Sequence, residues 1–163
     1  MRPDVYFSVD IEADGPIPGP YSMLSVGVAV AGRFDGTFSA ADPTRDTFYR
    51  ELRPISEQYV PEALAVSGLD RAELARTGAD PAVAMAELSA WVESLATGGS
   101  VFGHSGCFDV KTAYAVKAGV PLSRSVKGRM PRHLLSARRH THHALDDAVE
   151  QAELFANVMR WRP

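Results

Sequence analysis

The chain of 163 residues contains very little cysteine and no long run of apolar residues. Cys107 is the only cysteine, so an internal disulfide bond and a zinc site of four thiolates are both excluded. No stretch approaches the roughly 18 apolar residues of a membrane-spanning helix, and Asp4, Asp10 and Glu12 interrupt the region where a signal peptide would lie. We therefore expect one domain over residues 1–163, in a reducing, cytoplasmic setting and without membrane contact.

Acidic residues are absent from one segment of the chain, although the net charge of −3 is small. Residues 110–145 contain eight Lys or Arg and no Asp or Glu, whereas residues 1–109 contain 16 acidic and seven basic residues. This distribution is typical of a protein that holds cations in one place and phosphate groups in another. Chance clustering on a solvated surface is the alternative interpretation.

The spacing of apolar residues predicts an α/β protein. Strands are expected over residues 6–12, 23–30, 47–52 and 100–104. Helical signals begin near Pro61, and longer helices are expected from Pro81 to Gly98-Gly99, over residues 110–118 and over residues 145–159. Residues 123–139 are expected to be mostly loop. The first three strands favour an antiparallel meander, and the order of all elements predicts a mixed central sheet flanked by helices.

Asp10 and Glu12 stand at the end of the first predicted strand, separated by Ile11. Side chains alternate between the faces of a strand, so both carboxylates point to one side, roughly 7 Å apart along the strand. Two neighbouring carboxylates repel each other, and a divalent cation between them relieves this repulsion. A metal site is one interpretation of the pair, and a solvated strand end is the other.

Further aspartates lie where helices are expected to begin. Asp109 stands at the start of the helix over residues 110–118, and Asp146 and Asp147 at the start of the last helix. The helix dipole favours acids in a first turn by a few tenths to about 1 kcal/mol, which alone explains the last two. Asp10, Glu12, Asp109 and Asp147 together offer four carboxylates and no thiolate, a donor set that selects Mg²⁺ or Mn²⁺ over zinc.

His142 precedes Asp147 by five residues. Residues five apart on a helix differ by about 140° in direction, so these two side chains would not share a helical face. One of them must therefore lie in the preceding loop, from which a mobile imidazole can approach metal-bound water while Asp147 stays fixed as a ligand. His140 and His143 crowd the same stretch.

These patterns resemble the three motifs of the DEDD exonucleases of the histidine subtype, the group that includes the proofreading subunit of DNA polymerase III, ribonuclease T and oligoribonuclease. The Asp-x-Glu motif matches Asp10 and Glu12, and the second motif matches residues 103–109, which end in Asp109. The stretch from His142 to Asp147 is close to the third motif, His-x-Ala-Leu-x-Asp. Their order agrees, and the resemblance covers roughly Val5 to Phe155.

The resemblance implies a ribonuclease H-like fold and a 3′-5′ exonuclease that releases nucleoside monophosphates from single-stranded nucleic acid, with RNA slightly favoured over DNA. It implies a site of two Mg²⁺ or Mn²⁺ ions held by Asp10, Glu12, Asp109 and Asp147. It assigns His142 as the general base, with His143 second because the tyrosine subtype has its tyrosine there. Several small members are homodimers, so a homodimer is possible here.

The resemblance also suggests where the substrate binds. The backbone amides of Ala13 and Asp14 are expected to contact the terminal nucleotide. Met23 and Phe108 are candidates for apolar wedges between bases, with core packing as their alternative role.

Arg138 and Arg139, in the basic segment, are expected to contact phosphates. Two other interpretations stay open. One is a catalytically silent nucleic-acid-binding module with the same fold. The other is a zinc site built from His104, Cys107 and the histidine cluster.

Overall fold

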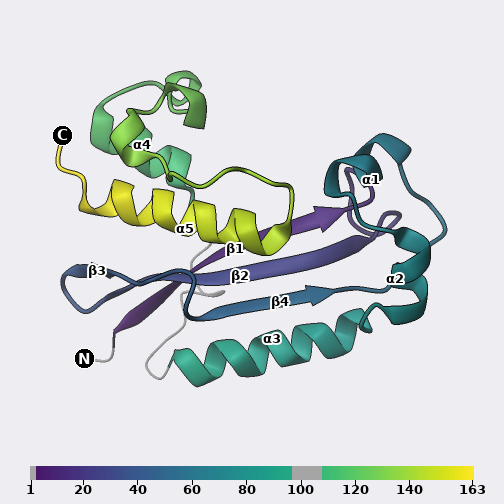
Figure 1. Ribbon diagram of the computed structural model, residues 1–163. Helices are drawn as coiled ribbons and strands as arrows, with labels where there is room; N and C mark the ends of the chain where they lie inside the picture. Colours follow the sequence, from purple (N-terminus) through teal and green to yellow (C-terminus); the bar gives the residue numbers. More distant parts are fainter. Residues whose placement is uncertain (1–2, 97–107) are drawn as a thin grey trace.

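The computed structural model describes residues 3–96 and 108–163 (Figure 1). Its strands are β1 (Asp4–Ala13), β2 (Met23–Phe34), β3 (Phe38–Ala40) and β4 (Thr47–Glu51). Among the described residues, β2 pairs with β1 along one edge and with β3 and β4 along the other, and all of these pairings are antiparallel. The strand predicted over residues 100–104, which would make the sheet mixed, lies outside the described residues.

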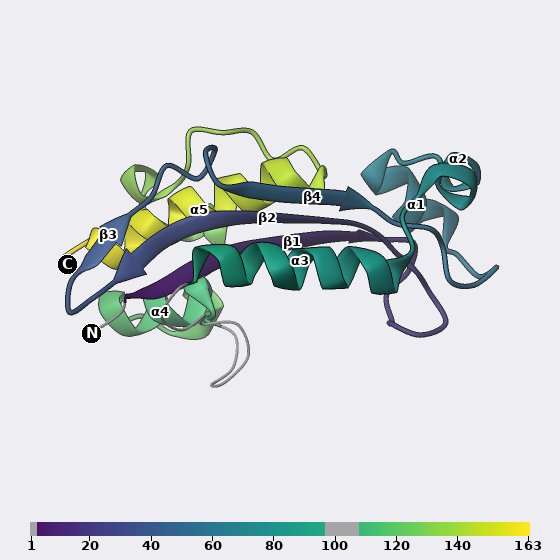
Figure 2. The same ribbon diagram turned by 90° about the horizontal axis from the view of Figure 1, so that it is seen from below.

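The helices are α1 (Pro61–Ser67), α2 (Arg71–Thr77), α3 (Pro81–Leu95), α4 (Val110–Ala118) and α5 (Ala144–Arg160). Three short 3₁₀ helices lie in the basic segment: η1 (Leu122–Arg124), η2 (Lys127–Arg129) and η3 (Arg132–Leu134). α5 covers one face of the sheet and α3 the other, and α1 and α2 lie at one end of the strands (Figures 1 and 2). None of the helices in the described ranges is both long enough and apolar enough to cross a bilayer.

β2 is buried from Leu24 to Gly32 because both of its faces are covered. The cluster on the α5 side comprises Ala29, Ala31, Val149, Ala152 and Phe155. The cluster on the α3 side comprises Val26, Val28 and Phe48, with Leu88 and Trp91 packed against it. A strand covered on both faces needs apolar side chains at successive positions, which explains its continuous apolar run.

Gly27 allows α5 to begin directly on the sheet. A Cβ atom at Gly27 would overlap the backbone of Ala144 and Leu145, the first two residues of α5. Glycine is the only residue that leaves room for so close an approach. The contact sets the N-terminus of α5 above the middle of β2, between β1 and β4.

The predicted helix starts are confirmed. Asp80 and Asp109 cap α3 and α4 by accepting backbone N–H groups of the first turn, and Gly119 ends α4 with a φ of 64°. α3 ends at Leu95 rather than at the Gly98-Gly99 pair, which lies outside the described residues. β2 extends four residues beyond the prediction, to Phe34, because it continues into a hairpin with β3, a strand too short to produce a periodic pattern.

Candidate active site

The end of β1 presents Asp10 and Glu12 on the face of the sheet that α5 covers. Asp10 lies opposite Gly27 on β2, and Gly27 lies opposite Tyr49 on β4. Glu12 lies two residues further along β1, opposite Ser25. Paired residues of neighbouring strands share a face, so the two carboxylates and Tyr49 surround the place where α5 begins.

The first turns of α5 bring Asp147 to the two carboxylates of β1. Oxygen atoms of Asp10, Glu12 and Asp147 lie within 4.8 Å of one another, and Asp147 is fully buried. One helical turn further on, Gln151 donates a hydrogen bond from Nε2 to Asp10 Oδ1 at 2.8 Å. The strand end and the helix start therefore converge as predicted, and Gln151 fixes the orientation of Asp10.

The carboxylates of this cluster are electrostatically crowded. Burial raises the pKa of Asp10, with the charge of Asp147 adding to the rise and the Gln151 hydrogen bond opposing it. Burial also raises the pKa of Glu12, and the charge of Asp10 raises it further. No Lys or Arg contributes to these changes in pKa. Three converging carboxylates of this kind fit a hard divalent cation, which would neutralise their repulsion.

Asp147 also holds the loop that precedes α5. Its Oδ1 accepts the backbone N–H of Thr141 and its Oδ2 that of His142, both at 2.9 Å. His142 has a φ of 58°, in the left-handed region of backbone conformation that residues other than glycine rarely occupy. The prediction that His142 lies in the loop while Asp147 lies on the helix is confirmed, because α5 begins at Ala144.

The three neighbouring histidines have different surroundings. His142 is exposed, and its ring meets that of His140 edge-on at 4.5 Å between centroids. His140 Nδ1 lies 3.1 Å from Asp147 Oδ2. The ring of His143 instead stacks on Tyr49, with centroids 4.6 Å apart and planes at 26°. An exposed imidazole beside Asp147 suits a base that meets substrate, whereas the stacked ring of His143 is held in place.

Tyr49 was not expected from the sequence to belong to this site. Burial, followed by the charge of Glu51, raises the pKa of Tyr49 to about 12, so the phenol stays protonated and donates to Glu51 Oε1 at 3.1 Å. The register of β4 against β2 places it there. No local pattern of residues 47–52 specifies that register, because it depends on pairing between separate strands.

Asp109 does not join the carboxylate cluster. Its side chain is exposed and caps α4, where it accepts the backbone N–H groups of Lys111 and Thr112 and the hydroxyl of Thr112. The hydrogen bond from Thr112 lowers the pKa of Asp109. Within the described residues, Asp109 belongs to neither group of side chains close enough to share a metal ion. Its role as a ligand stays a prediction.

Asp14 has a structural role that the sequence did not reveal. Its buried carboxylate accepts the backbone N–H of Ser22 at 2.6 Å and Arg71 Nε at 3.0 Å. Its own backbone N–H is donated to the carbonyl of Ser22 at 3.0 Å, so this amide already has a partner within the chain, and its expected contact with a nucleotide stays a prediction. Ala13, the last residue of β1, pairs with Met23 beyond an irregularity in the register, and its expected substrate contact stays a prediction.

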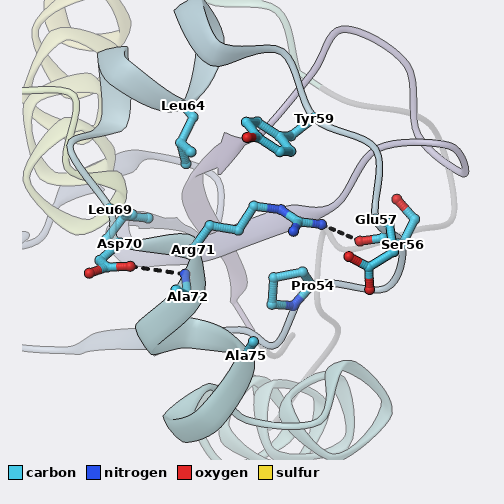
Figure 3. Close-up of a pocket in the computed structure, with 10 residues that line it drawn as sticks. All are labelled: Pro54, Ser56, Glu57, Tyr59, Leu64, Leu69, Asp70, Arg71, Ala72 and Ala75. Atoms are coloured by element: carbon cyan, nitrogen blue, oxygen red, sulfur yellow. Dashed lines mark hydrogen bonds between the residues drawn. The ribbon is translucent and has the colours of Figure 1, made fainter.

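Arg71 spans a cavity of about 510 Å³ beside α2 (Figure 3). Its guanidinium lies 5.2 Å from the ring centroid of Tyr59 and donates to the carbonyl of Ser56 as well as to Asp14. The other lining residues are Pro54, Glu57, Leu64, Leu69, Asp70, Ala72 and Ala75. The cavity is therefore joined to the end of β1 through Asp14, two residues beyond Glu12.

The two predicted apolar wedges differ in their contacts. Met23 packs against the core cluster of Val26, Val28 and Phe48, which corresponds to the alternative role of core packing. Phe108 is 45% exposed and meets the rings of Tyr6 and Phe155 edge-on. Phe108 therefore keeps an exposed face that a base could contact.

The two arginines predicted to contact phosphates also differ. Arg138 forms an ion pair with Glu153 at 2.7 Å, which raises the pKa of Arg138. Arg139 is exposed, and we find no hydrogen bond or ion pair for its side chain among the described residues. Arg139 is the better placed of the two for a phosphate, because Glu153 already neutralises Arg138. His104 and Cys107, of the alternative zinc site, lie outside the described residues.

The chain has a sequence relative among characterised nucleases. It is 41% identical over 97 residues to the 3′-5′ DNA exonuclease Cap18 of Escherichia coli, a match that covers 58% of this chain and 46% of the relative. The chain thus matches less than half of the length of this relative. No protein-family model matches the chain.

Solved structures extend the comparison to nearly the whole chain. The nuclease domain of 3′hExo, a DEDDh family member bound to rAMP, superposes with a TM-score of 0.68 at 16% identity, covering 98% of this chain and 92% of that domain. The chain has the fold of this nuclease domain. The predicted resemblance and the ribonuclease H-like fold class are thereby confirmed. The structure of cell-death related nuclease 4 (CRN-4) is also similar, with a TM-score of 0.57 at 12% identity, over 96% of this chain and 63% of CRN-4.

Proposed function

We propose that this chain is a metal-dependent 3′-5′ exonuclease that releases nucleoside monophosphates from single-stranded nucleic acid. The observation that carries the proposal is the convergence of Asp10, Glu12 and Asp147 within 4.8 Å, beside the exposed His142, in a DEDDh fold. The name of the E. coli relative supports the reaction.

Asp10, Glu12 and Asp147 would hold Mg²⁺ or Mn²⁺, with Asp109 as the fourth ligand that its motif implies. Two such ions activate water and stabilise the leaving 3′ oxygen when they are bound. Gln151 would keep Asp10 oriented towards them, since its amide already occupies one side of that carboxylate.

His142 would accept the proton of the attacking water. Its backbone is fixed by Asp147 while its ring is exposed, so the imidazole can reach solvent and substrate from a defined anchor point. General-base catalysis of this kind contributes roughly 10²–10⁴ in rate.

The substrate remains part of the proposal. The relative is named as a DNA exonuclease, whereas one structure neighbour is described as recognising a histone mRNA stem-loop, with a TM-score of 0.64 at 14% identity. We keep the predicted slight preference for RNA over DNA, and Arg139 as the contact to phosphate. We likewise propose a homodimer, from the resemblance to small members of the group, and a cytoplasmic location, from the single cysteine.

A catalytically silent binding module is the second candidate. One observation favours it, because Asp109 caps α4 instead of joining the other carboxylates. A silent module would bind nucleic acid without shortening it, so one assay of strand length distinguishes the two candidate functions.

The deciding experiment is a product ladder from 5′-labelled single-stranded RNA and DNA of equal sequence, with Mg²⁺ or Mn²⁺. The wild type should shorten the strands stepwise from the 3′ end, and Asp10→Asn should not. Asp42→Asn, at an exposed aspartate outside the cluster, is the matched control and should keep activity. Binding without shortening by the wild type would favour the silent module, and the rate ratio between RNA and DNA tests the sugar preference.

A further inference from the structure

A second group of side chains that can bind a metal shares Asp147 with the carboxylate cluster. Ligand atoms of His140, His142 and Asp147 lie within 4.8 Å of one another. The two histidines are exposed and Asp147 is buried, so the group opens to solvent on its imidazole side. Its donor set of two nitrogens and one oxygen differs from the all-oxygen set of Asp10, Glu12 and Asp147.

We propose that His140, His142 and Asp147 form a zinc site separate from the proposed magnesium or manganese site. Zinc binds imidazole nitrogen and carboxylate oxygen at about 2.0–2.2 Å, commonly with three protein ligands and one open position. Ligand atoms around such an ion are roughly 3.4 Å apart, so rotation of the exposed histidine rings is sufficient to close the group. Mg²⁺ prefers oxygen ligands and gains little from the two imidazoles.

Glu150 provides an independent observation in favour of the site. It lies on α5 one turn after Asp147 and is 3% exposed. Its Oε1 pairs with Lys127, but its Oε2 accepts no hydrogen bond from any residue that the structure describes. Oε2 lies 3.4 Å from His140 Nδ1. The same Nδ1 atom lies 3.1 Å from Asp147 Oδ2, so this unpartnered buried oxygen borders the place where His140 and Asp147 would share the ion.

Zinc at this position would inhibit the exonuclease, a consequence that rests on the proposed function. The ring nitrogen of His142 that binds zinc cannot at the same time accept a proton from water. Asp147 would also be drawn from the carboxylate cluster to the histidines. The site would therefore lower activity at zinc concentrations well below those of magnesium, since nitrogen-containing sites favour zinc over magnesium.

The test measures zinc binding directly, in the absence of nucleic acid. Zn²⁺ is titrated against a chromogenic chelator with four proteins: wild type, the double variant Asp10→Asn with Glu12→Gln, His140→Ala, and His133→Ala. His133 lies in η3, is exposed and belongs to neither metal-binding group, so it controls for the loss of one surface histidine. The wild type, the double variant and His133→Ala should bind one zinc ion with similar affinity, and His140→Ala should bind it at least tenfold more weakly.

Two outcomes would overturn the site. Equal zinc affinity in wild type and His140→Ala would remove His140 from it, and loss of zinc binding in the double variant would show that zinc occupies the carboxylates of β1 instead. Neither outcome depends on nuclease activity. If the strands are not shortened but zinc binds as expected, the proposed function fails and the zinc site stands.

Discussion

The carboxylate of Asp147 accepts the backbone N–H of His142 at 2.9 Å while it also converges with Asp10 and Glu12. One buried side chain thus fixes the distance between the carboxylate cluster and the loop that carries the proposed base. Because this anchor uses the backbone of His142, the imidazole can be removed without releasing the loop.

The first prediction separates the two candidate bases. His142→Ala should lower kcat by roughly 10²–10⁴, because it removes the proposed base, and should leave Mn²⁺ affinity nearly unchanged. His143→Ala should lower kcat less than tenfold, since its ring is stacked on Tyr49. Single-turnover rates and Mn²⁺ titrations of both variants check this. A larger loss in His143→Ala would transfer the role to His143.

The second prediction concerns the contact between Gly27 and α5. Gly27→Ala should destabilise the fold by about 1–3 kcal/mol, because the added methyl group overlaps the backbone of Ala144 and Leu145. The same displacement should weaken Mn²⁺ binding, since Asp147 moves with α5. Gly128→Ala is the matched control, because its Cβ would meet no atom within 4 Å. Urea unfolding measures the first effect, and equal stability of the two variants would contradict it.

The third prediction concerns the buried ion pair of Asp14 and Arg71. Arg71→Ala should lower the free energy of unfolding by about 3–5 kcal/mol, because it leaves the buried carboxylate without its cation. Arg53→Ala breaks an ion pair with Asp80 whose side chains are about half exposed, and should cost no more than about 1 kcal/mol. A similar loss in free energy of unfolding for both variants, measured by urea unfolding, would contradict the idea that burial of Asp14 makes its ion pair more important for stability.

The fourth prediction is a pH dependence of stability without metal. The pKa of Asp10 is raised, so the folded protein holds its proton more tightly than the unfolded chain, and this contribution to stability is lost as pH rises through the folded pKa. Asp42, Asp109 and Glu153 have lowered pKa values and act in the opposite direction. The prediction therefore concerns the difference in free energy of unfolding between Asp10→Asn and the wild type. This difference should shift in favour of Asp10→Asn as pH rises from about 4 towards 7.

Urea unfolding in EDTA at several pH values measures this difference. Adding Mn²⁺ should shrink it at the upper end of the range, because the cation binds the ionised carboxylates of the wild type. A difference that does not change with pH would contradict the raised pKa of Asp10.

The fifth prediction distinguishes Arg138 from Arg139. Arg139→Glu should weaken binding of single-stranded nucleic acid and reduce the slope of log affinity against log salt by about 0.7 or more. Arg138→Glu should have a smaller effect on that slope, because Glu153 already neutralises this arginine. Fluorescence anisotropy at several salt concentrations checks both variants, and an unchanged affinity in both would remove the basic segment from the substrate path.

Local sequence signals predicted most of the elements, with the short strand β3 as an exception, but not all of their contacts. The caps Asp80 and Asp109 depend on neighbouring residues, so they could be identified directly. The convergence of Asp10 and Asp147 was predicted only through the order of the three motifs. The positions of Tyr49 and Asp14 follow from strand register and from a partner 57 residues away, and no periodic pattern specifies such pairings.

The hydrogen bond between Asp10 and Gln151 joins residues that are 141 positions apart in the chain. Because β1 precedes α5 in the chain, β1 is synthesised first and α5 later. The three carboxylates cannot meet before α5 docks on β2. A nascent chain consequently lacks this cluster until α5 has been synthesised and has docked on the sheet.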